Sequence, residues 1–172
     1  MKHLAIAFSS VVFPLILLLA GVAAAQTRQP QPSLKDTLEW MQNTLYEKGN
    51  VNIDIAGELR SVSLTDFSEC QIWFTYTATK DGRESYSMGE SLNLADIDPS
   101  YVNFHPFPKG HIREGFGLFS AGIQNDAKKI KFRSHGSDFA VSKISFDMDA
   151  DYGARFTKAF KHAVNLCVCT EN

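Results

Sequence analysis

The spacing of apolar residues along this chain changes from about 3.6 to 2 and back again, which limits the fold to strands flanked by two helices. Leu34, Leu38, Met41 and Leu45 follow one another at intervals of four, three and four, the apolar stripe of an amphipathic helix. Beyond Asn50 apolar and polar residues alternate, which indicates half-buried strands. The helical spacing returns only near the C-terminus.

The first helix carries signals for its two ends. Ser33 is typical of an N-cap residue, and Asp36 stands where an acidic capping-box partner belongs. Lys48 suits the last turn because a cation is favourable at the negative end of the helix dipole. Gly49 can then adopt the left-handed conformation that often ends a helix. We therefore predict a helix over 34–48.

One strand is especially clear, because its β-branched and aromatic residues alternate strictly. Asp81-Gly82 follows it, a favoured pair for a two-residue hairpin turn, so the next strand should pair with it. Glu90 interrupts the apolar side of that partner strand. The two faces of the first strand are Cys70, Ile72, Phe74, Tyr76 and Ala78, predicted to point inward, and Gln71, Trp73, Thr75, Thr77 and Thr79, predicted to point outward.

Shorter alternating segments predict further strands and bring the total to about seven. Gly115 and Gly117 indicate a bulge or a close approach of two backbone segments. Asp98-Pro99 indicates a turn. These additional strands are expected near Val62 and Leu64, 102–104, 116–123, 130–132 and 143–148.

The last element is predicted to be a helix with one strongly apolar face. Asp149 or Asp151 should cap its start. The apolar face comprises Tyr152, Phe156, Ala159, Phe160, Ala163 and Cys167.

The fold class that follows is α+β. We expect about seven antiparallel strands in a sheet or half-open barrel, with an N-terminal and a C-terminal helix packed on it. From about Leu59 to Cys167 this order resembles pleckstrin-homology-like domains, with a cystatin-like or lipocalin-like wrap as the alternative. Phosphoinositide binding does not carry over, since the corresponding loop between the first two strands, Thr65–Glu69, is acidic.

Two segments resemble a group of small exported bacterial proteins that have no assigned activity. The first is Leu92-Asn-Leu-Ala-Asp-Ile-Asp-Pro-Ser100, which resembles their turn of the form L-x-D-I/L-D-P. The second is Phe160-Lys-His-Ala-Val-Asn-Leu-Cys167, which resembles their helix end of the form A-x-x-H-A-x-x-L-C. The resemblance implies no mechanism, but it supports a turn at Asp98-Pro99 and a core or bridging role for Cys167.

The N-terminal residues have the three parts of a secretory signal peptide. Lys2 precedes an apolar run, and the small residues Ala23 to Ala25 end it, so cleavage is expected before Gln26. The alternative is an uncleaved membrane anchor. We expect a signal peptide over 1–25, a flexible leader over 26–32 and one globular domain over 33–172, exported to the periplasm or the extracellular space. No later segment is apolar enough to cross a membrane.

An oxidising compartment makes a disulfide plausible among the three cysteines. Cys70 and Cys167 are both predicted to face inward, so they are the preferred pair. Cys169 would then be a free thiol or an intermolecular link. The alternative is that all three are reduced.

Two acidic or histidine-rich segments deserve comparison with metal sites. Asp147, Asp149 and Asp151 alternate as in a calcium loop, but the glycine comes late and Lys158 replaces the closing glutamate. We interpret them as a strand end and a helix cap. The other segment, a Pro- and Gly-rich loop with His105, His111 and Glu114, meets no ligand-spacing rule, and neither does His135 in its turn.

No catalytic motif is present, so no catalytic, cofactor-binding or metal-binding residue is predicted. His162 precedes Cys169 by about two helical turns, but nothing orients such a pair as a thiol enzyme requires.

The formal net charge of −2 makes nucleic acid an improbable partner. We expect an exported, non-enzymatic binding or structural module for a protein or a small apolar ligand. The alternative is a small enzyme with dispersed catalytic residues. The outward face of Trp73, Thr75, Thr77 and Thr79 could be a docking surface or a solvated sheet face.

Overall fold

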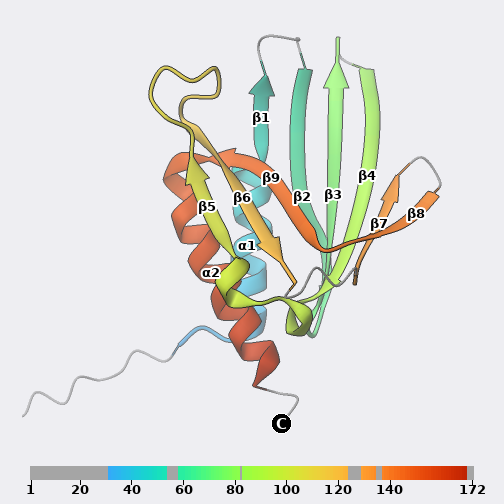
Figure 1. Cartoon of the computed structure of the whole chain (residues 1–172), viewed down its shortest axis with the longest axis vertical. Coiled ribbons are helices and arrows are strands. Elements are labelled where there is room, and N and C mark those ends of the chain that lie inside the picture. Colours follow the sequence, from blue (N-terminus) through green and yellow to red (C-terminus); the bar gives the residue numbers. More distant parts are fainter. Residues whose placement is uncertain (1–30, 54–57, 82, 124–128, 135–136, 170–172) are drawn as a thin grey trace, which may run out of the picture. The chain divides into compact units, whose positions relative to one another are not determined.

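The alternating segments form two antiparallel sheets in the computed structural model of the chain (Figure 1). It describes residues 31–53, 58–81, 83–123, 129–134 and 137–169, to which all structural statements refer. Two short 3-10 helices, Leu94–Asp96 and Pro99–Tyr101, connect the sheets. The helices and strands are α1 (Leu34–Lys48), β1 (Asn50–Ile53), β2 (Glu58–Ser68), β3 (Gln71–Lys80), β4 (Arg83–Asn93), β5 (Asn103–Pro106), β6 (Phe116–Gly122), β7 (Ile130–Ser134), β8 (Ser137–Val141), β9 (Lys143–Asp149) and α2 (Ala150–Val168).

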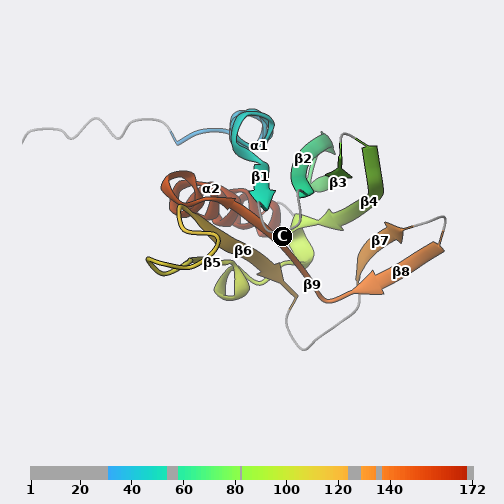
Figure 2. The same ribbon diagram turned by 90° about the horizontal axis from the view of Figure 1, so that it is seen from above.

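The larger sheet has six strands in the order β1-β2-β3-β4-β7-β8, and the smaller has three in the order β5-β6-β9. Lys80 pairs with Arg83 across the predicted Asp81-Gly82 turn, and Asp81 has the positive φ of 52° that such a turn requires. Figure 2 shows the β7–β8 hairpin standing out from the rest of the larger sheet. The described strands form two open sheets and no closed barrel.

The predicted α+β class with antiparallel sheets is confirmed, but the described residues contain nine strands rather than about seven. The sequence prediction missed β1 and β8. In β8, four of the five residues are exposed, so no alternation marks it. The segment Thr65–Glu69 was predicted to be a loop, whereas β2 continues to Ser68 and the chain turns only at Glu69 and Cys70. A register shift between Leu64 and Asp66 interrupts the alternation of apolar and polar residues, so the sequence pattern does not show that the strand continues.

Helix α1 has the predicted bounds because its capping box forms. The Ser33 side chain accepts a hydrogen bond from the Asp36 backbone N–H, and the Asp36 carboxylate accepts one from the Ser33 backbone N–H. Gly49 ends the helix, but the predicted left-handed conformation is wrong, since its φ is −80°. Glycine is required there for space, because a Cβ would overlap the carbonyl oxygens of Leu45 and Val62.

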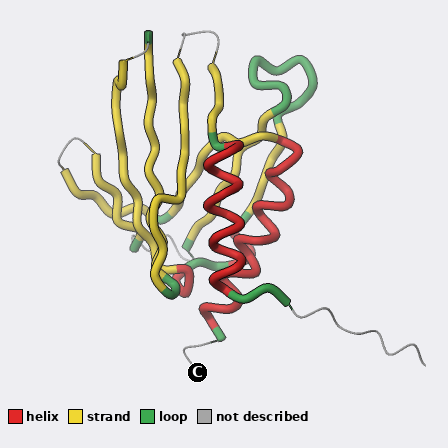
Figure 3. The backbone as a smooth tube through the Cα atoms, turned by 180° about the vertical axis from the view of Figure 1, so that it is seen from behind, coloured by secondary structure: helices red, strands yellow, loops and turns green. Residues whose placement is uncertain are grey.

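Helix α2 begins at one of the two predicted caps, Asp149, whose carboxylate accepts a hydrogen bond from the Asp151 N–H at 2.9 Å. Its predicted apolar face is buried at Phe156, Phe160 and Cys167. The helix contacts β5, β6 and β9 of the smaller sheet, whereas α1 contacts β1 and β2 of the larger one. The two helices also pack against each other, as Figure 3 shows from behind.

A chain of aromatic rings connects the two sheets to α2. Phe74 of β3 lies 5.7 Å from Phe146 of β9, measured between ring centroids, and Phe146 lies 4.9 Å from Phe119 of β6. Phe119 in turn contacts Phe156 and Phe160 at 5.1 and 5.2 Å. Tilted and edge-on rings at these separations attract one another beyond the effect of burial alone. The core therefore lies between the larger sheet on one side and the smaller sheet with α2 on the other.

The preferred disulfide is confirmed, since Cys70 and Cys167 are joined with their Cα atoms 5.7 Å apart. Cys169 is a free, exposed cysteine at the end of α2. Pro32–Asn172 form one compact unit. The predicted signal peptide lies outside the described residues, as does the predicted leader apart from residues 31 and 32. Among the described helices, none has the length and apolar character needed to span a membrane.

Candidate functional site

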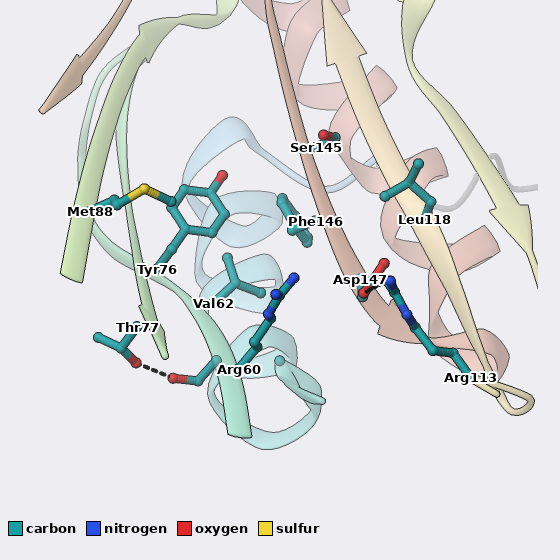
Figure 4. A pocket seen from close by; sticks show the side chains of 12 residues that line it. Arg60, Val62, Tyr76, Thr77, Met88, Arg113, Leu118, Ser145, Phe146 and Asp147 are labelled. Carbon is teal, nitrogen blue, oxygen red and sulfur yellow. Dashed lines mark hydrogen bonds and ion pairs between the residues drawn. The ribbon is translucent and has the colours of Figure 1, made fainter. Parts of the chain in front are cut away.

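A cleft of about 240 Å³ opens between the two sheets (Figure 4). We call it the inter-sheet cleft. One wall comes from β2, β3 and β4, and the other from β6, β9 and the loop before β6. Its lining residues are Gly49, Arg60, Ser61, Val62, Tyr76, Thr77, Met88, Arg113, Leu118, Ser145, Phe146 and Asp147.

Strand register produces the apolar part of the cleft. Val62 pairs with Tyr76, and Tyr76 pairs with Met88, so one row across three strands presents three apolar side chains. Phe146 faces this row from the smaller sheet, and Leu118 lines the cleft on the side of Asp147 (Figure 4). An apolar body bound here would therefore contact both sheets at once.

Arg113 and Asp147 form an ion pair on the β6–β9 side of the cleft, through Arg113 Nη1 and Asp147 Oδ2. Only 9% of the Asp147 side chain is exposed, against 29% for Arg113. Two further atoms of the pair, Arg113 Nε and Asp147 Oδ1, are buried and have no hydrogen-bond partner. Buried polar atoms without partners are few in folded proteins, so each one calls for an explanation.

The loop before β6 holds Arg113 in place. The Arg113 backbone N–H donates to His111 Nδ1 at 3.1 Å, and its carbonyl accepts from the Phe116 N–H at 3.1 Å. The guanidinium also lies 5.3 Å from the centroid of the Phe107 ring. His111 stacks on that ring with a centroid distance of 4.7 Å. Arg113 is thus supported by contacts to both its backbone and its side chain.

Arg60 is the second cation that lines the cleft. Arg60 extends from β2 toward the space between Val62 and Asp147, as Figure 4 shows. Two arginines therefore accompany the single carboxylate of Asp147 among the lining residues. Charged donors of this kind bind carboxylate oxygens more strongly than neutral donors do.

Tyr76, one of the cleft residues, also contacts the buried acid Glu90. Its hydroxyl donates to Glu90 Oε2 at 2.6 Å, and only 7% of Glu90 is exposed. Burial raises the pKa of Glu90 to about 7, against an opposing effect of the Tyr76 hydrogen bond. Burial, and then the adjacent carboxylate, raises the pKa of Tyr76 well above its usual value.

The three alternating aspartates have separate places. Asp147 belongs to the ion pair with Arg113, and Asp149 caps α2. Asp151 lies exposed in the first turn of that helix. The interpretation as a strand end and helix cap therefore describes Asp149 and Asp151, but Asp147 has the additional position in the cleft.

In the Pro- and Gly-rich segment, His111 and Glu114 make only local contacts. His105 is exposed on β5, while His111 stacks on Phe107 and accepts from Arg113. Glu114 Oε2 accepts from the Gly110 N–H at 2.7 Å. Among the described residues no three His, Cys, Asp or Glu side chains are grouped so that they could hold a metal ion. His135 lies outside the described residues.

The remaining candidates lie away from the inter-sheet cleft, except Thr77. His162 Nε2 is 2.9 Å from the Pro32 carbonyl oxygen, and the thiol of Cys169 is exposed. On the outward face of β3, Trp73, Thr75, Thr77 and Thr79 are all half-buried.

Sequence reasoning missed the two arginines and the Tyr76–Glu90 pair. Glu90 did give a signal, since an acid on the apolar side of a strand must be paired or shifted in pKa. Arg113 gave none, because only the folded loop brings it to Asp147, 34 residues further along the chain.

The chain matches no protein-family model, no curated protein and no solved structure.

Proposed function

We propose that this protein is an exported, non-enzymatic binding module that takes a small, largely apolar ligand in the inter-sheet cleft. The ligand would carry a hydrogen-bond acceptor beside a donor, as a 2-hydroxy acid does. The observation that supports this most is the pair of buried, unpartnered atoms, Arg113 Nε and Asp147 Oδ1. An acceptor on the ligand would satisfy Nε and a donor would satisfy Oδ1.

The size and lining of the cleft fit such a ligand. Its volume of about 240 Å³ is just below the roughly 300–1,000 Å³ of sites for drug-sized molecules, so the ligand is small. Val62, Met88 and Phe146 supply apolar surface for its body. The guanidinium of Arg113 favours a carboxylate as the acceptor, because a charged donor binds carboxylate oxygens more strongly than a neutral one does.

Export and the pleckstrin-homology-like layout remain parts of the proposal. A disulfide is what an oxidising, exported location would permit, and the Cys70–Cys167 bond agrees with that. Membership in the group of small exported bacterial proteins is likewise proposed from the two resembling segments alone. Ligand binding in the cleft does not depend on either point.

Titration of the protein with 3-phenyllactate and 2-hydroxyhexanoate tests the proposal. Each probe has an apolar body, a carboxylate and an adjacent hydroxyl. We expect chemical-shift changes in the amide NMR spectrum concentrated at the cleft residues, for example Val62, Met88 and Leu118. Removal of the hydroxyl, in 3-phenylpropionate and hexanoate, should weaken binding at least about tenfold, because a hydrogen bond to a charged group contributes roughly 1.5–3 kcal/mol.

A double variant separates binding from folding. Arg113→Met together with Asp147→Leu replaces the ion pair by apolar groups of similar size, a change that buried pairs often tolerate. We expect this variant to fold and to lose binding of both hydroxy acids. Arg133→Met together with Asp138→Leu removes an exposed pair on β7 and β8 and should leave binding unchanged. Binding by the first variant at wild-type strength, or shifts outside the cleft, would refute the proposal.

The alternative of a small enzyme rests on Glu90, because a carboxyl with a pKa near 7 suits general acid–base catalysis. However, its carboxylate is buried and already accepts from Tyr76. Chemical conversion of either hydroxy acid by the wild type, abolished in Glu90→Gln, would favour the enzyme.

A further inference from the structure

A second groove, of about 770 Å³, lies on the outer face of the larger sheet. It extends across β3, β4 and the β7–β8 hairpin and shares no lining residue with the inter-sheet cleft. We call it the outer-face groove. Its lining residues are Thr65, Trp73, Phe74, Thr75, Gly89, Glu90, Ser91, Lys131, Phe132, Arg133, Asp138, Phe139 and Ala140.

Strand register arranges several of these residues in two rows. In the first row Trp73 pairs with Ser91, and Ser91 pairs with Lys131. The second row, one pleat further along, runs from Thr75 through Gly89 and Arg133 to Asp138. Small residues of β4 thus form a floor between an aromatic wall on β3 and a cationic wall on β7.

Gly89 keeps this floor open without any backbone need for glycine. A Cβ at this position would meet only the Phe74 carbonyl oxygen, at 3.9 Å, which is ordinary contact. Glycine inside a strand weakens the sheet and often marks a place where a ligand approaches closely.

The charges of the groove are unequal. Arg133 and Asp138 form a two-bond ion pair, with Nε to Oδ1 at 2.7 Å and Nη2 to Oδ2 at 3.2 Å. Lys131 adds a further cation beside them. Glu90 also lines the groove, but its carboxylate accepts from Tyr76 on the opposite face of the sheet and only 7% of the residue is exposed. Asp66 pairs with Trp73 and is not a lining residue.

We propose that the outer-face groove binds an acidic saccharide, such as a short oligomer of uronic acids. A sugar ring has a C–H face that can lie flat on the Trp73 indole, and its hydroxyl edges can bond to Thr75 and Ser91. The uronate carboxylate then meets Lys131 and Arg133 on the opposite wall.

Two other classes of ligand fit less well. A peptide bound by strand addition would lie along the free edge of β8, away from Trp73, because Met88–Ser91 of β4 pair with β3 on one side and β7 on the other. A nucleotide could also stack on Trp73. Phosphates, however, favour the backbone N–H groups at the start of a helix, and the lining residues of the groove all belong to strands.

Tryptophan fluorescence can report this binding directly. The chain has two tryptophans, so Trp40→Phe leaves Trp73 as the single indole. We would titrate this variant with tetramers of galacturonate, mannuronate and glucuronate–N-acetylglucosamine, with cellotetraose as the neutral probe and AMP and a tetraglutamate peptide as other anions. We expect the Trp73 emission to shift with at least one acidic tetrasaccharide, and cellotetraose to bind at least tenfold more weakly.

Substitutions in the groove should remove this response without unfolding the protein. Gly89→Val fills the floor and favours a strand conformation, so it should fold at least as well as the parent and abolish binding. Lys131→Gln should weaken binding about tenfold, while Lys143→Gln, an exposed lysine of β9, should not. Thr79→Val, on the same face of β3 but outside the groove, is the control for Gly89→Val.

The proposal is overturned if no acidic tetrasaccharide shifts the emission, or if AMP or tetraglutamate binds more tightly than all of them. Equal binding of cellotetraose would show that charge plays no part and would also overturn it. Retained binding in Gly89→Val would place the saccharide elsewhere. None of these outcomes depends on the inter-sheet cleft, whose hydroxy-acid probes are tested separately.

Discussion

Glu90 shows how one buried residue makes the stability of the whole protein depend on pH. Its folded-state pKa of about 7 lies above the ordinary value of 4.5, mainly because burial disfavours the charged carboxylate. Between these two pH values the folded protein therefore holds a proton that the unfolded chain has released. The contribution of Glu90 to the unfolding free energy should therefore be fully present below about pH 4.5. It should be lost as the pH rises through 7.

We predict that Glu90→Gln removes this fall. Since one pKa unit corresponds to about 1.4 kcal/mol, the wild type should lose up to about 3 kcal/mol of unfolding free energy between pH 4.5 and 8. The glutamine variant, which stays neutral and can still accept from Tyr76, should be the more stable protein at pH 8. Urea denaturation at several pH values measures both effects, with exposed Glu84→Gln as the control. A Glu90→Gln variant that is less stable than wild type at pH 8 would contradict the assignment.

At this scale the sequence contained part of the answer. The alternation of β4 already placed Glu90 on the apolar side, so a buried acid was foreseeable. Its partner was not, because Tyr76 lies 14 residues away on β3 and becomes adjacent only through the strand register.

Among the elements, α2 and the smaller sheet fit together through one aromatic ring. Phe104 of β5 lies between Gly117 of β6 and Gly153 of α2, and a Cβ on either glycine would overlap the ring. The close backbone approach predicted from Gly115 and Gly117 is present at Gly117, where a Cβ would also lie only 2.7 Å from the His105 carbonyl oxygen. The sequence did not identify the ring, since helix and strand meet there only after the chain has folded.

We predict that Gly153→Ala destabilises the protein, although alanine in a helix is normally better than glycine by about 1 kcal/mol. The added methyl group must displace the Phe104 ring, and such overpacking costs roughly 1–3 kcal/mol. Phe104→Leu should relieve the clash, so the two substitutions together should cost less than the sum of their separate effects. Gly122→Ala is the matched control, because its Cβ would lie at an ordinary 3.5 Å from Tyr101. Urea denaturation that shows Gly153→Ala to be stabilising would rule out this packing.

The helices and strands themselves were predictable to different degrees for physical reasons. The bounds of α1 followed from its capping box, and β3 from its strict alternation. β8 was not predictable, because an exposed edge strand has no buried face to set a period.

For the whole molecule, the arrangement of the two sheets determines the candidate site, and the sequence did not predict that arrangement. The cleft residues come from positions between 49 and 147, on five strands and two loops. No local pattern reports which strands will face each other across a core. The disulfide was nevertheless foreseeable, because two cysteines each lay on a face already predicted to point inward.

That disulfide leads to the last prediction, which concerns the stability of the whole fold. It joins the β2–β3 turn of the larger sheet to the end of α2, which packs on the smaller sheet, and it closes a loop with a sequence separation of 97. On the chain-entropy model, a loop of this length restricts the unfolded chain enough to stabilise the fold by about 4–5 kcal/mol. Cys70→Ser together with Cys167→Ser should therefore lower the unfolding free energy by up to this amount.

Cys169→Ser should leave the unfolding free energy unchanged, because Cys169 is free and exposed at the end of α2. Thiol titration provides an independent measurement: the native protein should react at one cysteine, and the reduced, unfolded protein at all three. Three reactive thiols in native protein that has never met a reductant would contradict the bond. A different result would be an intact bond whose removal leaves the unfolding free energy unchanged. The entropic stabilisation requires that the bond restrict the unfolded chain, so that result would show that the unfolded chain already keeps Cys70 and Cys167 close together.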